Sequence, residues 1–387
     1  MRFLSADVIY PSYGNPLREH VLIVHHDGRI DGIVAKADID PLKIEHFDGA
    51  LCPGFVNAHC HLELSHLLGK FPMKTGLPAF LMEVTRQRET AMEDIISAMQ
   101  EADSSMWQNG IVAVGDISNA PHSLDIKADS RIYYHTFVEL LALDPQKATT
   151  AIEHGNAIVA LAKERNLSAS LAPHAPYTIS TLLVEGITRA CRDMGMPTSI
   201  HMLESNDENE FYVQATGGYR KLYRELGIPI THFEPTGKTS LESILPFMDK
   251  DVKTLLVHNT IATVWDADWA ENLHANLYWC FCPNANLFIE DRLPDIPELM
   301  QHIKHIAIGT DSLASNHGLS ILDELKTIAH TFPSLTTEEL LQWATDGGAQ
   351  FLGLSDRFGI LKPGLSPGIL HLTTSEIQPE TLVNRLF

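Results

Sequence analysis

The sequence predicts an α/β protein built on a parallel (β/α)8 barrel of the TIM type, with a small β-sandwich domain formed by both chain ends. Between residues 53 and 357, eight short apolar runs alternate with longer segments of helical period. Before and after this region the chain instead has the pattern of short strands and turns. Alternating strand and helix signals over roughly 250 residues favour a closed barrel. An open, doubly wound sheet is the rival that periodicity alone leaves.

Length and composition fit one large domain with a small one. The chain has 387 residues, 44% of them hydrophobic, which is enough for an extensive buried core. A formal net charge of -21 argues against nucleic-acid and anionic-membrane partners, and no apolar run approaches the length of a membrane span. Five scattered cysteines do not form a disulfide framework, so we expect a reduced compartment, the cytoplasm. A homodimer is the default expectation for such a protein.

The predicted β-sandwich domain comprises residues 1–52 and 358–387. In the first part, FLSADVIY, EHVLIVHHDGRIDGIVA and KIEHFDGALCPG combine alternating polarity, Asp-Gly turns and β-branched residues, which is typical of strands. In the second part, FGILKPGLSPGILHLTTSEI is again turn and strand. Because it lies outside the barrel pattern, we expect this segment to return and join the N-terminal strands.

The predicted barrel, residues 53–357, takes its strands from the eight apolar runs. In chain order they are FVNAHC, IVAVGDIS, RIYYHTFVEL, SASLAPHA, PTSIHM, TLLVHN, NLYWCFCP and HIAIGTDS. Helical stretches such as AFLMEVTRQRETAMEDIISAMQEADSSMW and AIEHGNAIVALAKERN lie between most of them. No long linker interrupts the pattern, so all eight units are predicted to belong to one barrel.

Histidines and one aspartate stand at the ends of five of these runs. His59 and His61 end the first run, and side chains two residues apart point to the same side of a strand. The fourth, fifth, sixth and eighth runs end, respectively, at His174, His201, His258 and Asp311. Parallel barrels carry their chemistry at the C-terminal ends of the strands. A lone histidine among 20 means little, but this set is expected to converge.

A cluster of imidazoles with a carboxylate at a barrel mouth predicts a metal site. These groups suit a borderline divalent ion, with Zn²⁺ as first choice and Fe²⁺ or Mn²⁺ as alternatives. The candidate ligands are spread along the chain without cysteine, which favours an open, catalytic site over a closed, structural one. Cys280 and Cys282 are interpreted as packing residues, and Asn286 as a turn residue.

On these residues the chain resembles the amidohydrolase superfamily, in its mononuclear deaminase branch. The matching segments are, in order, PGFVNAHCH, APHAPYTIS, HMLES, VHNT, CPNANL and GTDSLASN. The C-terminal FGILKPGLSPGILHLT also resembles the closing strand of that superfamily, with Pro367-Gly368 in place of the usual Ala-Asp pair. The resemblance covers nearly the whole chain.

The resemblance implies a role for each candidate residue. The implied ligands of one divalent metal ion are His59, His61, His201 and Asp311. Binuclear members carry a bridging lysine on the fourth strand, where this chain has His174, so a single ion is expected. Glu204 would be the acid/base group, and His258 and Asp311 would take a proton from the attacking water and orient it. His174 would contact the substrate.

The implied activity is that of an aminohydrolase that removes ammonia from the exocyclic amine of a purine nucleoside-like small molecule. Glu204 would protonate a ring nitrogen and then pass a proton to departing ammonia. The stretch HCHLELSHL, with Glu63 after the second histidine, is most similar to bacterial enzymes that deaminate 6-amino-6-deoxyfutalosine in menaquinone biosynthesis. Glu63 either faces the substrate or bonds to a loop. Arg88 and Glu89 lie where related enzymes place substrate contacts, with an exposed helical charge cluster as the other interpretation.

Several alternatives stay open at this point. S-adenosylhomocysteine, methylthioadenosine, adenosine, guanine and cytosine are rival amines, although deaminases of the first two usually have Pro-Met where this chain has Glu-Leu. A chlorohydrolase or a cyclic amidohydrolase would use a similar site, but Glu204 argues against a plain amidase. A non-catalytic barrel used for binding or assembly is the alternative of another class, and the retention of every expected group argues against it.

Overall fold

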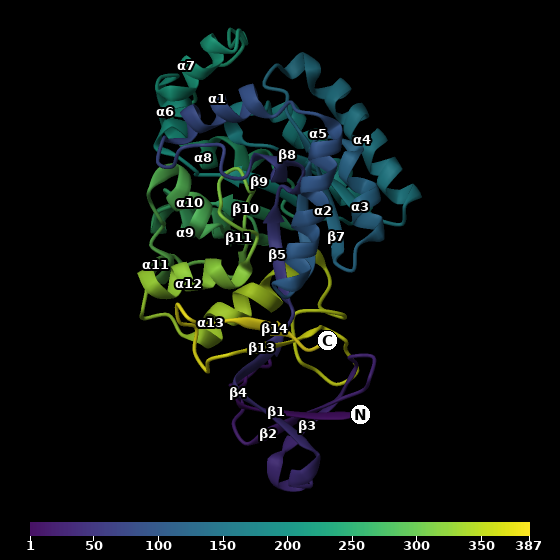
Figure 1. Ribbon diagram of the computed structural model, residues 1–387. Helices are drawn as coiled ribbons and strands as arrows, with labels where there is room; N and C mark the ends of the chain where they lie inside the picture. Colours follow the sequence, from purple (N-terminus) through teal and green to yellow (C-terminus); the bar gives the residue numbers. More distant parts are fainter.

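Eight parallel strands form a barrel, and each corresponds to one of the eight apolar runs. The computed structural model describes residues 1–387 (Figure 1). The barrel strands are β5 (Phe55–Cys60), β6 (Ile111–Ser118), β7 (Tyr133–Leu140), β8 (Ser168–Pro173), β9 (Thr198–Met202), β10 (Thr254–His258), β11 (Leu277–Phe281) and β12 (Ile306–Ile308). Continuous parallel pairing joins β5 to β8 in one four-stranded sheet and β9 to β12 in another.

Short backbone contacts close these two sheets into a ring. The N–H of His201 in β9 donates to the carbonyl of His174, just after β8, at 3.0 Å. On the other side, Cys60 in β5 forms a bridge with Asp311, just after β12. The predicted closed barrel is therefore confirmed over an open sheet. Both seams of the ring pass through residues of the predicted site, so the site and the closure of the barrel depend on each other.

Helices surround the barrel and form its rim. Their bounds are α1 (Leu77–Gln87), α2 (Met92–Gln108), α3 (Leu124–Asp129), α4 (Ala148–Glu164), α5 (Thr181–Met194), α6 (Asn206–Gln214), α7 (Gly218–Glu225), α8 (Ser240–Ile244), α9 (Val264–Leu273), α10 (Pro283–Glu290), α11 (Ile296–Leu299), α12 (Ile321–Thr331), α13 (Thr337–Gln342) and α14 (Gly348–Leu352). Local signals set several ends. Ser180 caps α5, Gly195 ends it at a φ of 65°, and a Thr263–Asp266 capping box starts α9. None of the helices combines the length and hydropathy that a membrane span needs.

Strands from both chain ends form one six-stranded sheet in the order β14-β13-β4-β1-β2-β3. These strands are β1 (Arg2–Ile9), β2 (His20–Val24), β3 (Ile30–Ala35), β4 (Ile44–Pro53), β13 (Ile369–Leu372) and β14 (Val383–Arg385). The strands expected as a sandwich thus share one hydrogen-bonded sheet, which packs around a small core of its own. The expected return of the C-terminal segment is confirmed, because β13 pairs antiparallel with β4.

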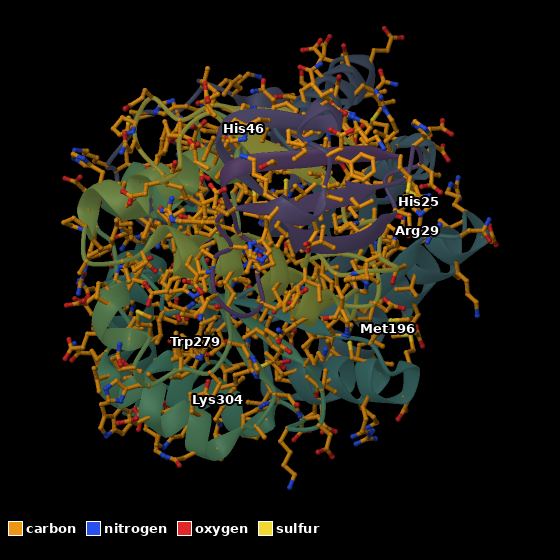
Figure 2. The ribbon with its side chains drawn as sticks, turned by 90° about the horizontal axis from the view of Figure 1, so that it is seen from below. His25, Arg29, His46, Met196, Trp279 and Lys304 are labelled. Carbon is orange, nitrogen blue, oxygen red and sulfur yellow. The ribbon has the colours of Figure 1, made fainter.

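Figure 1 places this terminal sheet at the bottom of the molecule, together with both chain ends. Figure 2 views it from below, where His25, Arg29 and His46 mark the sheet, and Trp279 and Lys304 mark the neighbouring β11–β12 side of the barrel. We propose residues 1–52 plus 358–387 as one domain and residues 53–357 as the other.

A buried ion pair between α3 and β6 supports the turn that follows β5. The Nζ atom of Lys127 in α3 lies 2.6 Å from a carboxylate oxygen of Asp116 in β6, and both side chains are fully buried. The same Nζ donates to the hydroxyls of Ser118 and Thr136, each at 3.0 Å. The other oxygen of Asp116 accepts the N–H of Leu62 at 2.8 Å. Because Leu62 directly follows His61, this pair fixes the backbone beside the predicted site.

Removing one partner of this pair should destabilise the protein strongly. Lys127→Met leaves the charge of Asp116 buried without compensation, and we expect the free energy of unfolding to fall by about 3–5 kcal/mol. Lys326→Met, which breaks an exposed pair with Asp323, is the matched control and should cost less than about 1 kcal/mol. Urea unfolding followed by circular dichroism measures both. Equal stabilities for the two variants would contradict this view of the pair.

Candidate active site

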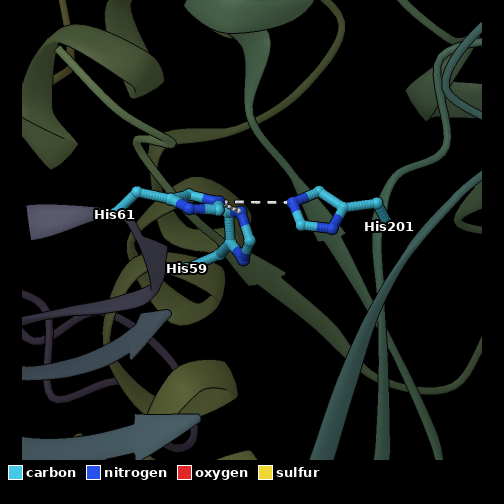
Figure 3. A group of neighbouring side chains, drawn as sticks. All are labelled: His59, His61 and His201. Carbon is cyan, nitrogen blue, oxygen red and sulfur yellow. Dashed lines mark hydrogen bonds between the residues drawn. The ribbon is translucent and has the colours of Figure 1, made fainter. Parts of the chain in front are cut away.

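Three imidazoles converge at the C-terminal ends of β5 and β9. The Nε2 atom of His61 lies 3.1 Å from Nε2 of His59 and 3.2 Å from Nε2 of His201 (Figure 3). All three side chains are buried. Burial and the neighbouring imidazoles lower the pKa of His61 and His201 well below the usual value. Both rings are therefore neutral near pH 7, and their nitrogen lone pairs face one point.

Asp311 completes this cluster from the exit of β12. Its Oδ1 atom lies 3.5 Å from Nε2 of His61 and 3.7 Å from Nε2 of His59. The hydroxyl of Ser315 donates to the other carboxylate oxygen. Burial alone would raise the pKa of Asp311, but its hydrogen bond to His59 and the other nearby histidines outweigh burial and lower it. The cluster thus offers three imidazoles and one carboxylate, a set that could hold a borderline divalent ion.

His258, at the end of β10, faces the same point in a fixed tautomer. Its Nδ1 atom donates to Oδ1 of Asn286 at 3.0 Å, while the amide of Asn286 donates back to the His258 carbonyl at 3.2 Å. Nε2 is therefore the acceptor, and it lies 3.7 Å from the Glu204 carboxyl group. Burial lowers the pKa of His258 to about 4, so the ring is neutral. Asn286, expected only as a turn residue, orients this histidine.

Glu204 follows β9 and is 5% exposed. The backbone N–H groups of Leu203 and Glu204 donate to the carboxylate of Glu208, at 3.0 and 3.1 Å, which fixes the turn. Burial, together with the charges of Asp311 and Glu208, raises the pKa of Glu204 well above the usual value. This shift favours the protonated form of Glu204. Glu208 was not expected from the sequence, because it lies in an acidic stretch, LESNDENE, that is also typical of a solvated loop.

His174 lies between the cluster and the open part of the cavity. Its carbonyl accepts the Nδ1–H of His201 at 2.7 Å, which sets the tautomer of that ring. Its own Nδ1 lies 2.8 Å from the hydroxyl oxygen of Thr178, and that hydroxyl donates to the carbonyl of Ala175. The Nδ1 of His174 is therefore the donor, which leaves Nε2 as an acceptor. Burial lowers the pKa of His174 to about 4.

One cavity of about 300 Å³, which opens between α1 and α7, is lined by His61, His174, His201, Glu204, His258 and Asp311. His59 is fully buried and does not line it. The floor of the cavity is polar and its outer walls are apolar, with contributions from Leu81, Val84, Leu141, Leu226, Ile228 and Ile289. A polar floor under an apolar funnel suits a ligand whose reacting end is polar and whose remote end is apolar.

Besides His174, the three other expected substrate contacts fall in different places. Arg88 lines the cavity at its rim. Glu63 is buried but does not line the cavity, because the tight turn Leu62–Leu67 directs its carboxylate to the N–H of Asn119, at 3.1 and 3.2 Å. The guanidinium of Arg88 lies 3.4 Å from the same carboxylate. Glu89 follows the end of α1, is exposed and lies outside the cavity. Of the three, only Arg88 can touch a ligand there.

Two polar cavity residues, Asn119 and Glu139, were not expected from the sequence. The side-chain amide of Asn119, just after β6, donates to the Glu139 carboxylate at 2.9 Å and to its carbonyl at 3.2 Å. Glu139 lies at the end of β7, and burial raises its pKa to about 7. The rule that barrel chemistry sits at strand ends was the one signal that pointed to Glu139.

Comparisons with known proteins agree with this geometry. A family model described as the amidohydrolase family matches residues 50–377. An adenosine deaminase from Helicobacter pylori is 28% identical over 81% of this chain and 77% of its own length. An aminodeoxyfutalosine deaminase from Nitratiruptor is 27% identical over 80% of this chain and 76% of its own length.

Solved structures share the fold over nearly the whole chain. The aminofutalosine deaminase of Helicobacter pylori, in complex with methylthio-coformycin, aligns with a TM-score of 0.80 at 22% identity, over 96% of this chain and 91% of the other. An adenosine deaminase from Xanthomonas campestris with bound zinc aligns with a TM-score of 0.73 at 20% identity, over 96% and 84%.

Loss of the carboxylate in the cluster should weaken metal binding. We expect metal-free protein to bind about one equivalent of Zn²⁺ and to melt at a higher temperature when loaded, because a ligand of the folded state stabilises it. Asp311→Asn should bind Zn²⁺ at least about tenfold more weakly, whereas Asp346→Asn, outside the site, should bind it normally. Titration with elemental analysis measures this. Unchanged affinity in Asp311→Asn would refute the assignment.

Proposed function

The chain belongs to the amidohydrolase family, and we propose that it is a metal-dependent aminohydrolase that removes ammonia from a purine nucleoside-like substrate. The observation that carries the proposal is the placement of a buried acid, Glu204, 3.7 Å from the neutral ring of His258, in the cavity that contains the histidine–aspartate cluster. Two relatives named as deaminases of nucleosides, aligned over most of the chain, support it.

We propose that one divalent ion, most simply Zn²⁺, is held by His59, His61, His201 and Asp311, with Fe²⁺ and Mn²⁺ as alternatives. The donor set fits such an ion, since three ring nitrogens that face one another cannot all be satisfied by hydrogen bonds among themselves. When bound, the ion supplies a Lewis acid that lowers the pKa of water toward neutrality.

Side chains of the protein accept and donate the protons of the reaction. The carboxylate of Asp311 and Nε2 of His258 accept the proton that the attacking water loses, and Asn286 keeps that nitrogen free by holding the opposite one. Oxygen then bonds to the ring carbon that carries the amine, and electrons move onto the adjacent ring nitrogen. Glu204, whose raised pKa favours the protonated form, donates its proton to that nitrogen and becomes a carboxylate, so no negative charge builds up on the ring.

Collapse of this adduct breaks the carbon–nitrogen bond. The ionised Glu204 takes the proton of the adduct's hydroxyl group and passes it to the departing amine, which leaves as ammonia, and the ring carbon keeps the oxygen as a carbonyl. The proton held by Asp311 and His258 then returns to Glu204. One water is consumed for each ammonia released. His174, with a free acceptor nitrogen beside the floor of the cavity, contacts the ring on its far side.

We propose 6-amino-6-deoxyfutalosine, an intermediate of menaquinone biosynthesis, as the substrate. This nucleoside carries a large aromatic group with a carboxylate at its remote end. The apolar outer walls of the cavity match such a group, and Arg88 at the rim matches the carboxylate. Adenosine and methylthioadenosine lack that charge and remain the alternatives that the cavity fits less well.

A screen for released ammonia tests this function. We expect the highest kcat/KM for aminodeoxyfutalosine among a panel that also contains adenosine, methylthioadenosine, S-adenosylhomocysteine, guanine and cytosine. Arg88→Leu should raise KM for aminodeoxyfutalosine about tenfold, through loss of a charged hydrogen bond, and should leave KM for adenosine unchanged. Arg86→Leu, on the same helix and outside the cavity, is the control. No ammonia from any amine would favour a non-catalytic barrel.

Glu204→Gln should reduce the rate of catalysis and leave the fold unchanged. The amide cannot transfer protons, so we expect kcat to fall at least about a hundredfold, with zinc content and the circular dichroism spectrum unchanged. Glu210→Gln, on the exposed face of the following helix α6, should keep the wild-type rate. A rate for Glu204→Gln close to that of the wild type would remove Glu204 from the mechanism.

A further inference from the structure

One oxygen of the Glu139 carboxylate accepts a hydrogen bond, and the other oxygen has no donor. One oxygen accepts the side-chain amide of Asn119 at 2.9 Å. The other, Oε1, is buried and has no hydrogen-bond partner. Its neighbour at 3.7 Å, Nδ1 of His201, already donates to the carbonyl of His174. A buried carboxylate oxygen without a donor is costly, so its persistence calls for a ligand that supplies one.

This oxygen belongs to a side chain that lines the cavity beside the reacting groups. Glu139 contributes to the cavity wall together with His174 and His201, and the ligand atoms of the three lie within 4.8 Å of one another. Asn119 is itself anchored, because its backbone N–H donates to the carboxylate of Glu63. The Glu139 carboxylate is therefore set in position before any ligand arrives.

We propose that Glu139 accepts a hydrogen bond from a ribose hydroxyl of the substrate, an inference that rests on the proposed function. An adenine-type nucleoside has few donors. Its exocyclic amine is the leaving group and must lie at the metal cluster, and its ring nitrogens are acceptors. The sugar hydroxyls are the donors that remain. Glu139 is thus a specificity residue that selects ribonucleosides over deoxynucleosides and repels nucleosides that carry phosphate on those hydroxyls.

A role as metal ligand is the rival for Glu139, since Glu139, His174 and His201 could together hold an ion. His201, however, has both ring nitrogens engaged: Nδ1 with the carbonyl of His174, and Nε2 with the cluster at 3.2 Å from His61. The two roles differ in their effect on metal content. Replacing a metal ligand lowers the metal content of the protein, whereas replacing a residue that binds the sugar leaves it unchanged.

Calorimetric binding to the zinc-loaded protein tests the proposal. The probes are coformycin and three nucleosides that cannot be deaminated: inosine, 2′-deoxyinosine and 3′-deoxyinosine. We expect the wild type to bind inosine at least about tenfold more tightly than one of the deoxy compounds, as a charge-assisted hydrogen bond provides. Glu139→Leu should bind all three within about twofold and keep its zinc.

Two further variants keep the result decisive. Glu139→Gln retains the shape of the side chain and should reduce the preference for inosine at least about threefold, because neutral hydrogen bonds are weaker; it decides the question if the leucine variant does not fold. Glu210→Gln, which changes an exposed carboxylate of α6 outside the cavity, should keep the wild-type preference.

Three results would overturn the proposal: a wild type without preference for inosine, a full preference in the Glu139 variants, or loss of zinc from them. Failure of the proposed function has a separate signature. In that case the wild type binds neither coformycin nor any of the nucleosides. The role proposed for Glu139 is then refuted together with the proposed function.

Discussion

The meeting of three buried imidazoles at one point is the constraint on which the rest of this structure depends. Rings whose acceptor nitrogens lie 3.1–3.2 Å apart have no proton to share among all of them, so the arrangement makes sense around a cation. The backbone around it is shaped to match. His258 and Asp311 have φ values of 73° and 56°, a left-handed conformation that costs non-glycine residues of order 1–3 kcal/mol and clusters at functional sites.

The surroundings of the carboxyl groups in the site shift their pKa values in different directions. The histidines around Asp311 lower its pKa, whereas burial beside other carboxylates raises the pKa of Glu204. Burial also raises the pKa of Glu63 and Glu139 to about 7. A chain with a net charge of -21 thus keeps several acids inside its barrel by holding them close to neutrality or by pairing them, as with Asp116 and Lys127.

The sequence contained enough information for the barrel and for the cluster. Parallel strands must bring their carboxyl ends to one edge, so residues as far apart as His59 and Asp311 could be placed together from the pattern of runs alone. Side-chain direction beyond the strand ends could not be predicted in this way. A short turn carries Glu63 away from the cavity, and the partners of Asn286, Glu208 and Glu139 come from other segments of the chain.

The terminal sheet can form completely during biosynthesis only after strands from both parts of the chain have been synthesised. β4 leaves the ribosome early, but the strand that covers its edge, β13, starts at residue 369. Until the last residues emerge, β4 presents unpaired backbone groups that can recruit strands from other chains. A polypeptide that stops before β13 therefore has an exposed edge on β4 although all eight barrel strands are present, and pairing with residues 369–372 covers this edge.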